Sequence, residues 1–96
     1  MLILRVLASE PLHGYAIAQR IAELSQRELS VEEGSLYPAL QKLLLQGWVR
    51  AAPAVSDTGR QVREYRLTPS GRRQLEREQD NYRRISRAIT TVLETA

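Results

Sequence analysis

Hydrophobic residues in the first half of the chain recur mainly at helical spacing, and proline, glycine and polar stretches separate the runs. Residues 2–8 are apolar almost all round, which predicts a short helix buried on more than one side. A second helix is predicted over about residues 14–26, where Ile17, Ile21 and Leu24 form one stripe. The pattern therefore predicts that the chain begins with two helices.

A third helix is predicted from about Ser35 to Gln46, after a short extended segment at residues 29–31. Ser35 is expected to cap this helix, which would place Pro38 in the first turn, where its missing N–H has no helical partner to lose. Gly47 is expected to end the helix, as glycine commonly does just past a C-cap. Four residues form the inward stripe of this helix: Leu36, Leu40, Leu43 and Leu44.

The second half of the chain predicts a β-hairpin followed by one long helix. Strands are expected over residues 48–52 and 62–67, joined by a loop over residues 53–61 that contains Pro, Asp and Gly. Thr68 as a cap and Pro69 at the first position are a typical helix start. The helix is expected to continue to about Thr95, a length of roughly 40 Å at the rise of an α-helix.

The last helix carries a heptad pattern along one side. Leu75, Tyr82 and Ile89 are spaced by seven, and Ile85 and Val92 occupy the alternate positions of the seam. So long a helix cannot be covered by so small a domain, which predicts a partner helix, most simply from a second copy of the chain. The predicted dimer-interface residues are Leu4, Leu7, Leu75, Tyr82, Ile85, Ile89, Val92 and Leu93.

The predicted order of elements is helix, helix, strand, helix, two-stranded hairpin and long helix, which is that of a winged helix-turn-helix. The expected fold class is therefore mainly α with a small β part (α+β). Residues 1–67 are expected to form the winged helix-turn-helix DNA-binding domain, and residues 68–96 a C-terminal dimerisation helix.

Composition narrows the function classes that this architecture can serve. The chain has 96 residues, enough for one small domain, and its 43% hydrophobic and 26% charged residues are ordinary for a globular protein. The absence of Cys and the single His exclude disulfides and thiolate or His-rich metal sites. No paired carboxylates, nucleophile–base pair or phosphate-binding glycine loop is visible, so we expect neither an enzyme nor a cofactor. The apolar run before Arg5 is too short for a signal peptide or membrane span, so we expect a cytoplasmic protein without a membrane partner.

Positive charge is concentrated in the C-terminal part of the chain. The net charge is +3, and residues 60–96 carry nine Arg against five acidic residues. Such a region is a candidate surface for an anionic polymer. The third helix has Ser35, Tyr37, Gln41 and Lys42 opposite its leucine stripe, and these side chains suit contacts to base edges and phosphates. Arg60, at the end of the hairpin loop, and Arg63 behind it are placed to reach phosphates or a minor groove.

Several sequence motifs together are similar to those of one family. They are His13-Gly14-Tyr15-Ala16-Ile17-Ala18, Glu33-Gly34-Ser35-Leu36-Tyr37-Pro38-Ala39-Leu40, Gly47-Trp48-Val49, Gly59-Arg60, and the segment from Tyr65 to Leu75. In this order and spacing they resemble the PadR family of bacterial transcriptional regulators, over nearly the whole chain.

The resemblance implies a dimeric winged-helix repressor that binds double-stranded DNA at a pseudo-palindromic operator. The third helix would read the major groove, the wing would touch the flanking DNA, and the first and last helices would build the dimer. Some members of the family release DNA when a small aromatic effector binds near the dimer interface, which makes Trp48 and Tyr82 candidate ligand residues. The family's DNA contacts would fall on these positions: Tyr15, Ser35, Tyr37, Pro38, Gln41, Lys42 and Arg60.

Some alternatives remain open at the level of sequence. Tyr15 suits either a phosphate contact or packing against the third helix, and Tyr82 suits either the dimer seam or a ligand platform. His13 has no partner for catalysis or metal binding and is expected to be a helix-cap or turn residue. A winged-helix protein-interaction module without DNA readout is the alternative function, because Glu32 and Glu33 adjoin a third helix that carries a single Lys.

Overall fold

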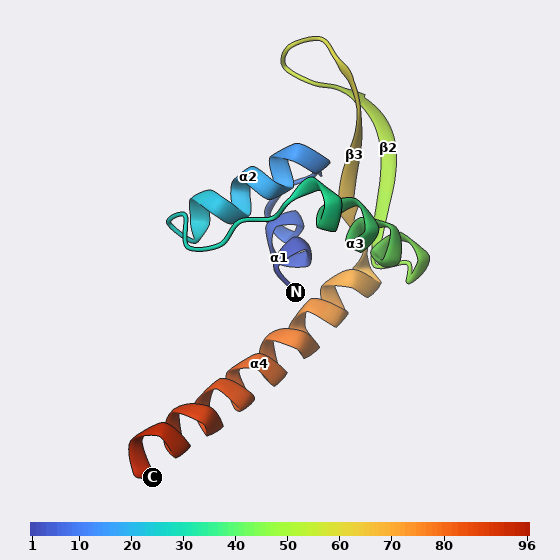
Figure 1. Cartoon of the computed structure of the whole chain (residues 1–96). Helices are drawn as coiled ribbons and strands as arrows, with labels where there is room; N and C mark the ends of the chain where they lie inside the picture. Colours follow the sequence, from blue (N-terminus) through green and yellow to red (C-terminus); the bar gives the residue numbers. More distant parts are fainter.

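The computed structural model describes all 96 residues as a small winged-helix body from which one long helix projects (Figure 1). A three-stranded antiparallel sheet has the order β1-β3-β2, and its two long strands form the wing hairpin. The predicted winged helix-turn-helix architecture and the long last helix are confirmed. The elements are α1 (Leu2–Ser9), β1 (Leu12–His13), α2 (Gly14–Leu24), α3 (Glu33–Leu45), β2 (Val49–Val55), β3 (Gln61–Leu67) and α4 (Pro69–Thr95).

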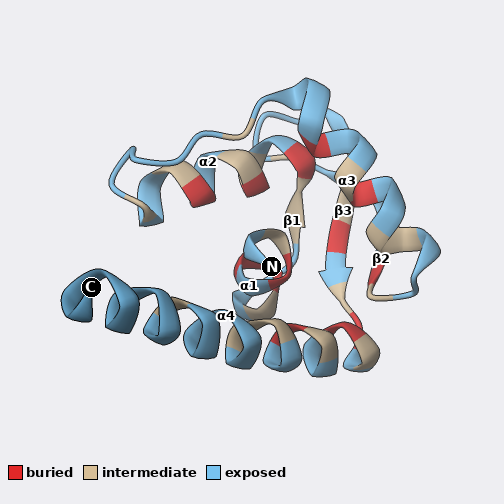
Figure 2. Cartoon of the chain, turned by 60° about the horizontal axis from the view of Figure 1, so that its bottom comes forward, coloured by how far each residue is buried: buried red, intermediate tan, exposed pale blue.

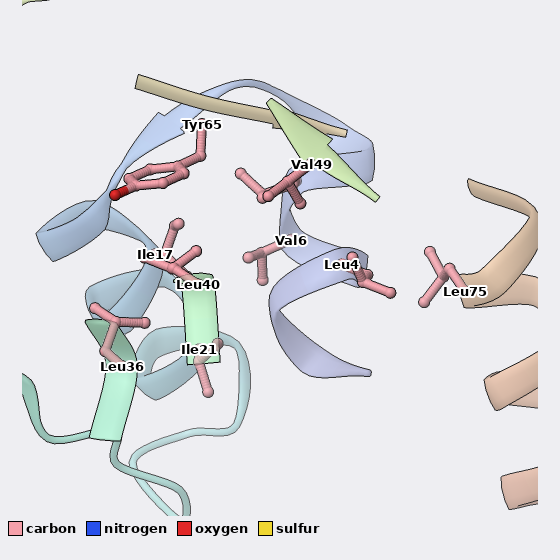
Figure 3. Packing of buried hydrophobic residues seen from close by; sticks show 10 residues of the cluster. Leu4, Val6, Ile17, Ile21, Leu36, Leu40, Val49, Tyr65 and Leu75 are labelled. Atoms are coloured by element: carbon pink, nitrogen blue, oxygen red, sulfur yellow. The ribbon is translucent and has the colours of Figure 1, made fainter. Parts of the chain in front are cut away.

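The hydrophobic core lies where the first three helices meet the sheet. Its four completely buried side chains, from α1, α2 and α3, are Leu4, Ile17, Leu36 and Leu40 (Figure 3). Val49 and Tyr65 close the core from the sheet, and Leu75 adds a contact from the start of α4. Buried residues therefore occupy the first turns of α4 only, and its remaining turns are exposed (Figure 2).

The predicted helix ends at Gly47 and Thr68 are confirmed, and they meet. Gly47 has φ +76°, and the N–H groups of Gly47 and Trp48 donate to the carbonyls of Leu44 and Leu43 at 3.0 and 3.1 Å. This is the hydrogen-bond pattern of a Schellman motif. The Thr68 hydroxyl accepts from the Gly71 N–H at 2.9 Å and donates to the Gly47 carbonyl at 2.7 Å. The end of α3 is thereby tied to the start of α4.

The predicted start of α3 is wrong by two residues. The helix begins at Glu33, because the Glu32 carbonyl already accepts from the N–H groups of Ser35 and Leu36, at 3.0 and 2.9 Å. Ser35 therefore lies inside the first turn and does not cap the helix. Pro38 falls in the second turn, where it cannot donate to the carbonyl four residues earlier.

The predicted extended segment at residues 29–31 forms no strand. The Ser25 hydroxyl accepts from the Leu29 N–H at 3.0 Å, which turns the chain back after α2. The third strand is instead β1, whose Leu12 pairs with Tyr65 and whose His13 pairs with Glu64.

The wing hairpin is longer, and its loop shorter, than predicted. Pro53 to Val55 belong to β2 and Gln61 belongs to β3, so the loop spans only residues 56–60. Backbone hydrogen bonds at both ends of the hairpin, Thr68 N–H to Trp48 carbonyl and Ser56 N–H to Arg60 carbonyl, fix the alternation of the pairs. Pro53, opposite Arg63, therefore occupies a non-hydrogen-bonded pair on an edge strand, where its missing N–H costs no ladder bond.

No helix combines the length and hydrophobicity needed to cross a bilayer.

Candidate nucleic-acid interface

An open groove separates the start of α2 and the start of α3 from the inner side of the wing. Its volume is about 790 Å³, and its walls are mainly polar and aromatic. Tyr15 comes from α2, Tyr37 from α3, and Arg60 and Arg63 from the wing. The structure thus brings together four of the side chains that the sequence predicted as DNA contacts.

The groove exists because α2 and α3 approach closely at their first turns. A Cβ placed on Gly14 would lie 3.0 Å from Cε1 and 3.1 Å from the hydroxyl oxygen of Tyr37. Any side chain at position 14 would push the Tyr37 ring away from its present place against α2. The ring keeps 47% of its surface exposed, and Tyr15 keeps 55%. Tyr15 is therefore not a core residue.

The start of α2 is capped by the histidine of the same motif. The Nδ1 atom of His13 accepts a hydrogen bond from the Ala16 N–H at 3.3 Å, as expected for a helix-cap residue. No group of three or more His, Asp or Glu side chains lies close enough together to hold a metal ion.

The loop of the wing is held by its own hydrogen bonds. The Gly59 N–H donates to the Ser56 carbonyl at 2.9 Å, and the Arg60 N–H donates to the Ser56 hydroxyl at 3.2 Å. Gly59 has φ +81°, the left-handed conformation that glycine adopts without strain. The Arg60 side chain thus extends from an ordered loop.

Neither wing arginine that faces the groove forms an ion pair. Arg20, Arg66 and Arg83 have carboxylates within 4.0 Å, whereas Arg60 and Arg63 have none. The Arg63 guanidinium lies 5.8 Å from the centroid of the Tyr65 ring, within the range of a cation–π contact. Two carboxylates, Glu33 and Asp57, also line the groove.

The outer face of α3 extends this surface beyond the groove. Leu36 and Leu40 are fully buried on the inner side of the helix. The remaining residues predicted to contact DNA, Ser35, Pro38, Gln41 and Lys42, are all exposed on α3. The groove and this exposed face adjoin at Tyr37.

Gly14, Tyr65 and Glu33 are among the groove residues that sequence analysis did not predict as contacts. Gly14 was part of a motif, but its contact with Tyr37 joins two helices and leaves no local signal. Tyr65 was noted only as the first residue of a motif, and it lines the groove because β3 pairs with β1 directly before α2. Glu33 belongs to the groove because α3 begins earlier than predicted.

Three of the predicted dimer-interface residues lie in the core of the chain itself. Leu4, Leu7 and Leu75 are 0–5% exposed, because α1 packs between the start of α4 and the other helices. They have almost no surface for a partner, so their assignment to a dimer interface is corrected. The other five are 48–76% exposed along α4: Tyr82, Ile85, Ile89, Val92 and Leu93.

The two candidate ligand residues lie apart within the chain. Trp48 is half-buried against the core, and its carbonyl accepts from the Thr68 N–H at 3.1 Å. Tyr82 is exposed on α4, and the eleven residues that separate it from Gly71, beside Trp48, span ~16 Å of helix. Neither residue lines any of the three main pockets of the chain.

Comparison with known proteins places these features in one family. The family model described as "Transcriptional regulator PadR-like family" matches residues 3–77. The transcriptional regulator Rv3488 of Mycobacterium tuberculosis is 34% identical over 87 residues, which cover 91% of this chain and 78% of that protein. An uncharacterized 37.1 kDa protein in transposon TN4556 of Streptomyces fradiae is 45% identical over 86 residues, and the match covers 90% of this chain but only 23% of that longer protein.

Solved structures agree with the family match. The crystal structure of a PadR family transcription regulator from Clostridium difficile R20291 superposes with a TM-score of 0.83 at 26% identity. The match covers 96% of this chain and 94% of that one.

Proposed function

Since the chain belongs to the PadR-like family of transcriptional regulators, we propose that it is a homodimeric repressor that binds a pseudo-palindromic operator. Family membership carries regulation of transcription through DNA, and it places the chain among proteins that are generally not enzymes. Repression, dimerisation and a symmetric operator go beyond what family membership carries.

One observation carries the proposal: the exposed polar face of α3 adjoins a groove that two unpaired arginines of the wing complete. Gln41 and Lys42 have the amide and ammonium groups that pair with base edges in a major groove. Arg60 and Arg63 have guanidinium groups free for phosphates. Base contacts and backbone contacts thus come from neighbouring elements.

A dimer is supported by the exposed apolar stripe of α4. Five large hydrophobic side chains follow one another on one side of the helix at coiled-coil spacing, and nothing in the chain covers them. A second α4 in antiparallel or parallel contact would bury them, and a two-fold axis would present two reading helices. Half-sites about 34–36 Å apart are expected for such an arrangement.

An aromatic effector would bind beside Tyr82 in this dimer. Trp48 is a weaker candidate because its ring packs against the core. A planar aromatic compound that binds at Tyr82 is expected to raise the melting temperature of the protein and to release bound DNA. An unchanged melting temperature across a panel of phenolic acids and dyes would remove the effector from the proposal.

Fluorescence anisotropy tests DNA recognition directly. A labelled duplex from immediately upstream of the protein's own gene is compared with a scrambled duplex of the same composition. The proposal expects tighter binding to the native duplex, and a loss on Arg60→Ala that the surface variant Arg73→Ala on α4 does not show. Equal binding of both duplexes would contradict sequence-specific recognition.

The alternative function is a winged-helix protein-interaction module. It is favoured by Glu33 and Asp57, whose carboxylates line the same groove as the two arginines. It predicts a protein partner whose binding is insensitive to salt, together with no effect of Arg60→Ala on any DNA interaction.

A further inference from the structure

The floor of the groove contains a phenol that the fold itself leaves without a partner. Tyr65 is only 5% exposed, since its ring packs in the core. Tyr65 nevertheless lines the groove, on β3 where that strand pairs with β1 just before α2, and its ring is drawn in Figure 3. Its hydroxyl forms no hydrogen bond within the chain. A hydroxyl at the edge of a core that has no internal acceptor is placed to donate to a ligand.

A second phenol without a hydrogen bond inside the chain, that of Tyr37, lines the same groove from α3. The hydroxyl oxygen of Tyr37 lies beside Gly14, 3.1 Å from where a Cβ of that residue would stand. The first turn of α2, whose N-terminal end carries the positive end of the helix dipole, begins at Gly14. Two phenols and a helix N-terminus therefore line the same groove.

The wing supplies a cation above this floor. Arg63 lies over the Tyr65 ring, with 5.8 Å between guanidinium carbon and ring centroid, and has no carboxylate partner. Glu33 and Asp57 also line the groove, and their negative charge limits the number of phosphate groups that it can hold. The arrangement suits one anion that is rich in hydrogen-bond acceptors.

We propose that the groove floor binds a single phosphate group, with the hydroxyls of Tyr65 and Tyr37 and the Arg63 guanidinium as its ligands. The oxygens of a phosphodiester carry no proton near neutral pH and only accept hydrogen bonds, which matches this set of donors. The inference rests on the proposed function, in which the phosphate is one phosphodiester of the operator backbone in each half-site. It assigns Tyr65, a residue of the protein core, to DNA positioning.

The experiment compares the wild-type protein with Tyr65→Phe, which removes only the hydroxyl. Thr91→Val is the matched control, because it also removes one hydroxyl, on the exposed side of α4, where that group donates to the Arg87 carbonyl. Tyr65→Phe is expected to weaken binding to the operator duplex about tenfold, which corresponds to about 1.4 kcal/mol. Its melting temperature should match that of the wild type, Thr91→Val should bind like the wild type, and Tyr37→Phe should show a loss similar to that of Tyr65→Phe.

A methylphosphonate scan of the duplex identifies the phosphate itself. One neutral methylphosphonate is introduced at a time along each strand, and one position per half-site is expected to cost the wild type about tenfold. On that duplex Tyr65→Phe should lose nothing more, because the contact is already gone. Equal affinities of wild type and Tyr65→Phe for every duplex would overturn the inference while leaving DNA binding intact.

Inorganic phosphate separates a DNA phosphodiester from a free anion. Amide shifts of Tyr15 and Tyr65 are followed by NMR as phosphate replaces chloride at constant ionic strength. If the wild type bound no duplex, the proposed function would fail, and shifts that disappear in Tyr65→Phe would still support a phosphate site, then for a small phosphate compound. No duplex binding and no such shifts would overturn both.

Discussion

At the scale of single residues, Gly71 has the least room for a side chain among the five glycines of the chain. A Cβ there would overlap the Trp48 carbonyl oxygen and would lie 2.7 Å from a methyl carbon of Leu67. We expect Gly71→Ala to destabilise the protein by about 3 kcal/mol, since backbone would have to move, and to lower the melting temperature by roughly 12–24 °C. Gly34→Ala is the control, because a Cβ at Gly34 meets nothing within 4 Å. A Gly71→Ala protein as stable as the wild type would contradict this account of the junction.

At Gln26, by contrast, a substitution is expected to stabilise the protein. Gln26 follows α2 with φ 54°, a left-handed conformation that costs a non-glycine residue about 1–2 kcal/mol. Gln26→Gly removes that cost but gains chain entropy on unfolding, so we expect a net stabilisation of about 0.5–1 kcal/mol. Thermal unfolding measures it, with Glu28→Gly, which does not have positive φ, expected to lose stability. A lower melting temperature for Gln26→Gly would show that no strain is relieved.

Residues whose role is decided by their neighbours in sequence could be predicted, and the others could not. Thr68, Pro69 and Gly47 lie at helix ends that were correctly predicted, because a cap bonds within three or four residues of itself. Ser35 is a residue type that commonly caps helices, but α3 begins before it, because the Glu32 carbonyl already accepts from the Ser35 and Leu36 N–H groups. The place of Tyr65 in the groove could not be predicted, because it depends on how β3, β1 and α2 pack together.

At the scale of elements, hydrophobic periodicity predicted the long helices correctly and the strands of the small sheet poorly. The strand β1 has two residues and exists only through its pairing with β3, which lies about fifty residues later. Pro53 suggested a loop, yet an edge strand accepts it where its N–H side carries no ladder bond. Heptad spacing, interrupted at Glu78, predicted that Leu75, Tyr82 and Ile89 belong to one dimer seam, whereas the fold buries Leu75 in the core and leaves the later positions exposed.

The exposed apolar stripe of α4 can be tested by placing a charged side chain within it. Ile89 is 54% exposed within the chain, in the middle of the uncovered stripe. A charged side chain there leaves the fold of one chain intact but cannot be buried in an apolar seam without a large desolvation cost. We expect Ile89→Asp to be monomeric in analytical ultracentrifugation while keeping its helical circular dichroism, and to bind the operator much more weakly. Thr91→Asp, on the other side of the helix, should remain dimeric.

At the scale of the whole molecule, shape and charge act together. The chain extends 55 × 29 × 22 Å, with the wing loop and the end of α4 at opposite ends of it (Figure 1). A dimer joined along the exposed part of α4 would hold the two wings apart, on the outer flanks. Six of the nine arginines of residues 60–96 lie on α4 and only three on the wing strand and its loop. Net charge therefore does not identify the arginines that bind DNA. The salt dependence of DNA binding, measured on Arg→Ala variants, does identify them.

Each phosphate neutralised by a protein cation contributes about −0.9 to the slope of log K against log salt concentration. Arg60 and Arg63 occur twice in a dimer, so replacing both by Ala should reduce the magnitude of that slope by about 4. The control is Arg73→Ala with Arg87→Ala, which removes the same charge from α4, where neither residue forms an ion pair. General attraction is screened within about 10 Å at 0.1 M salt, so this control should change the slope little. Equal slopes for the two double variants would assign the salt dependence to overall charge and would remove the wing from the DNA interface.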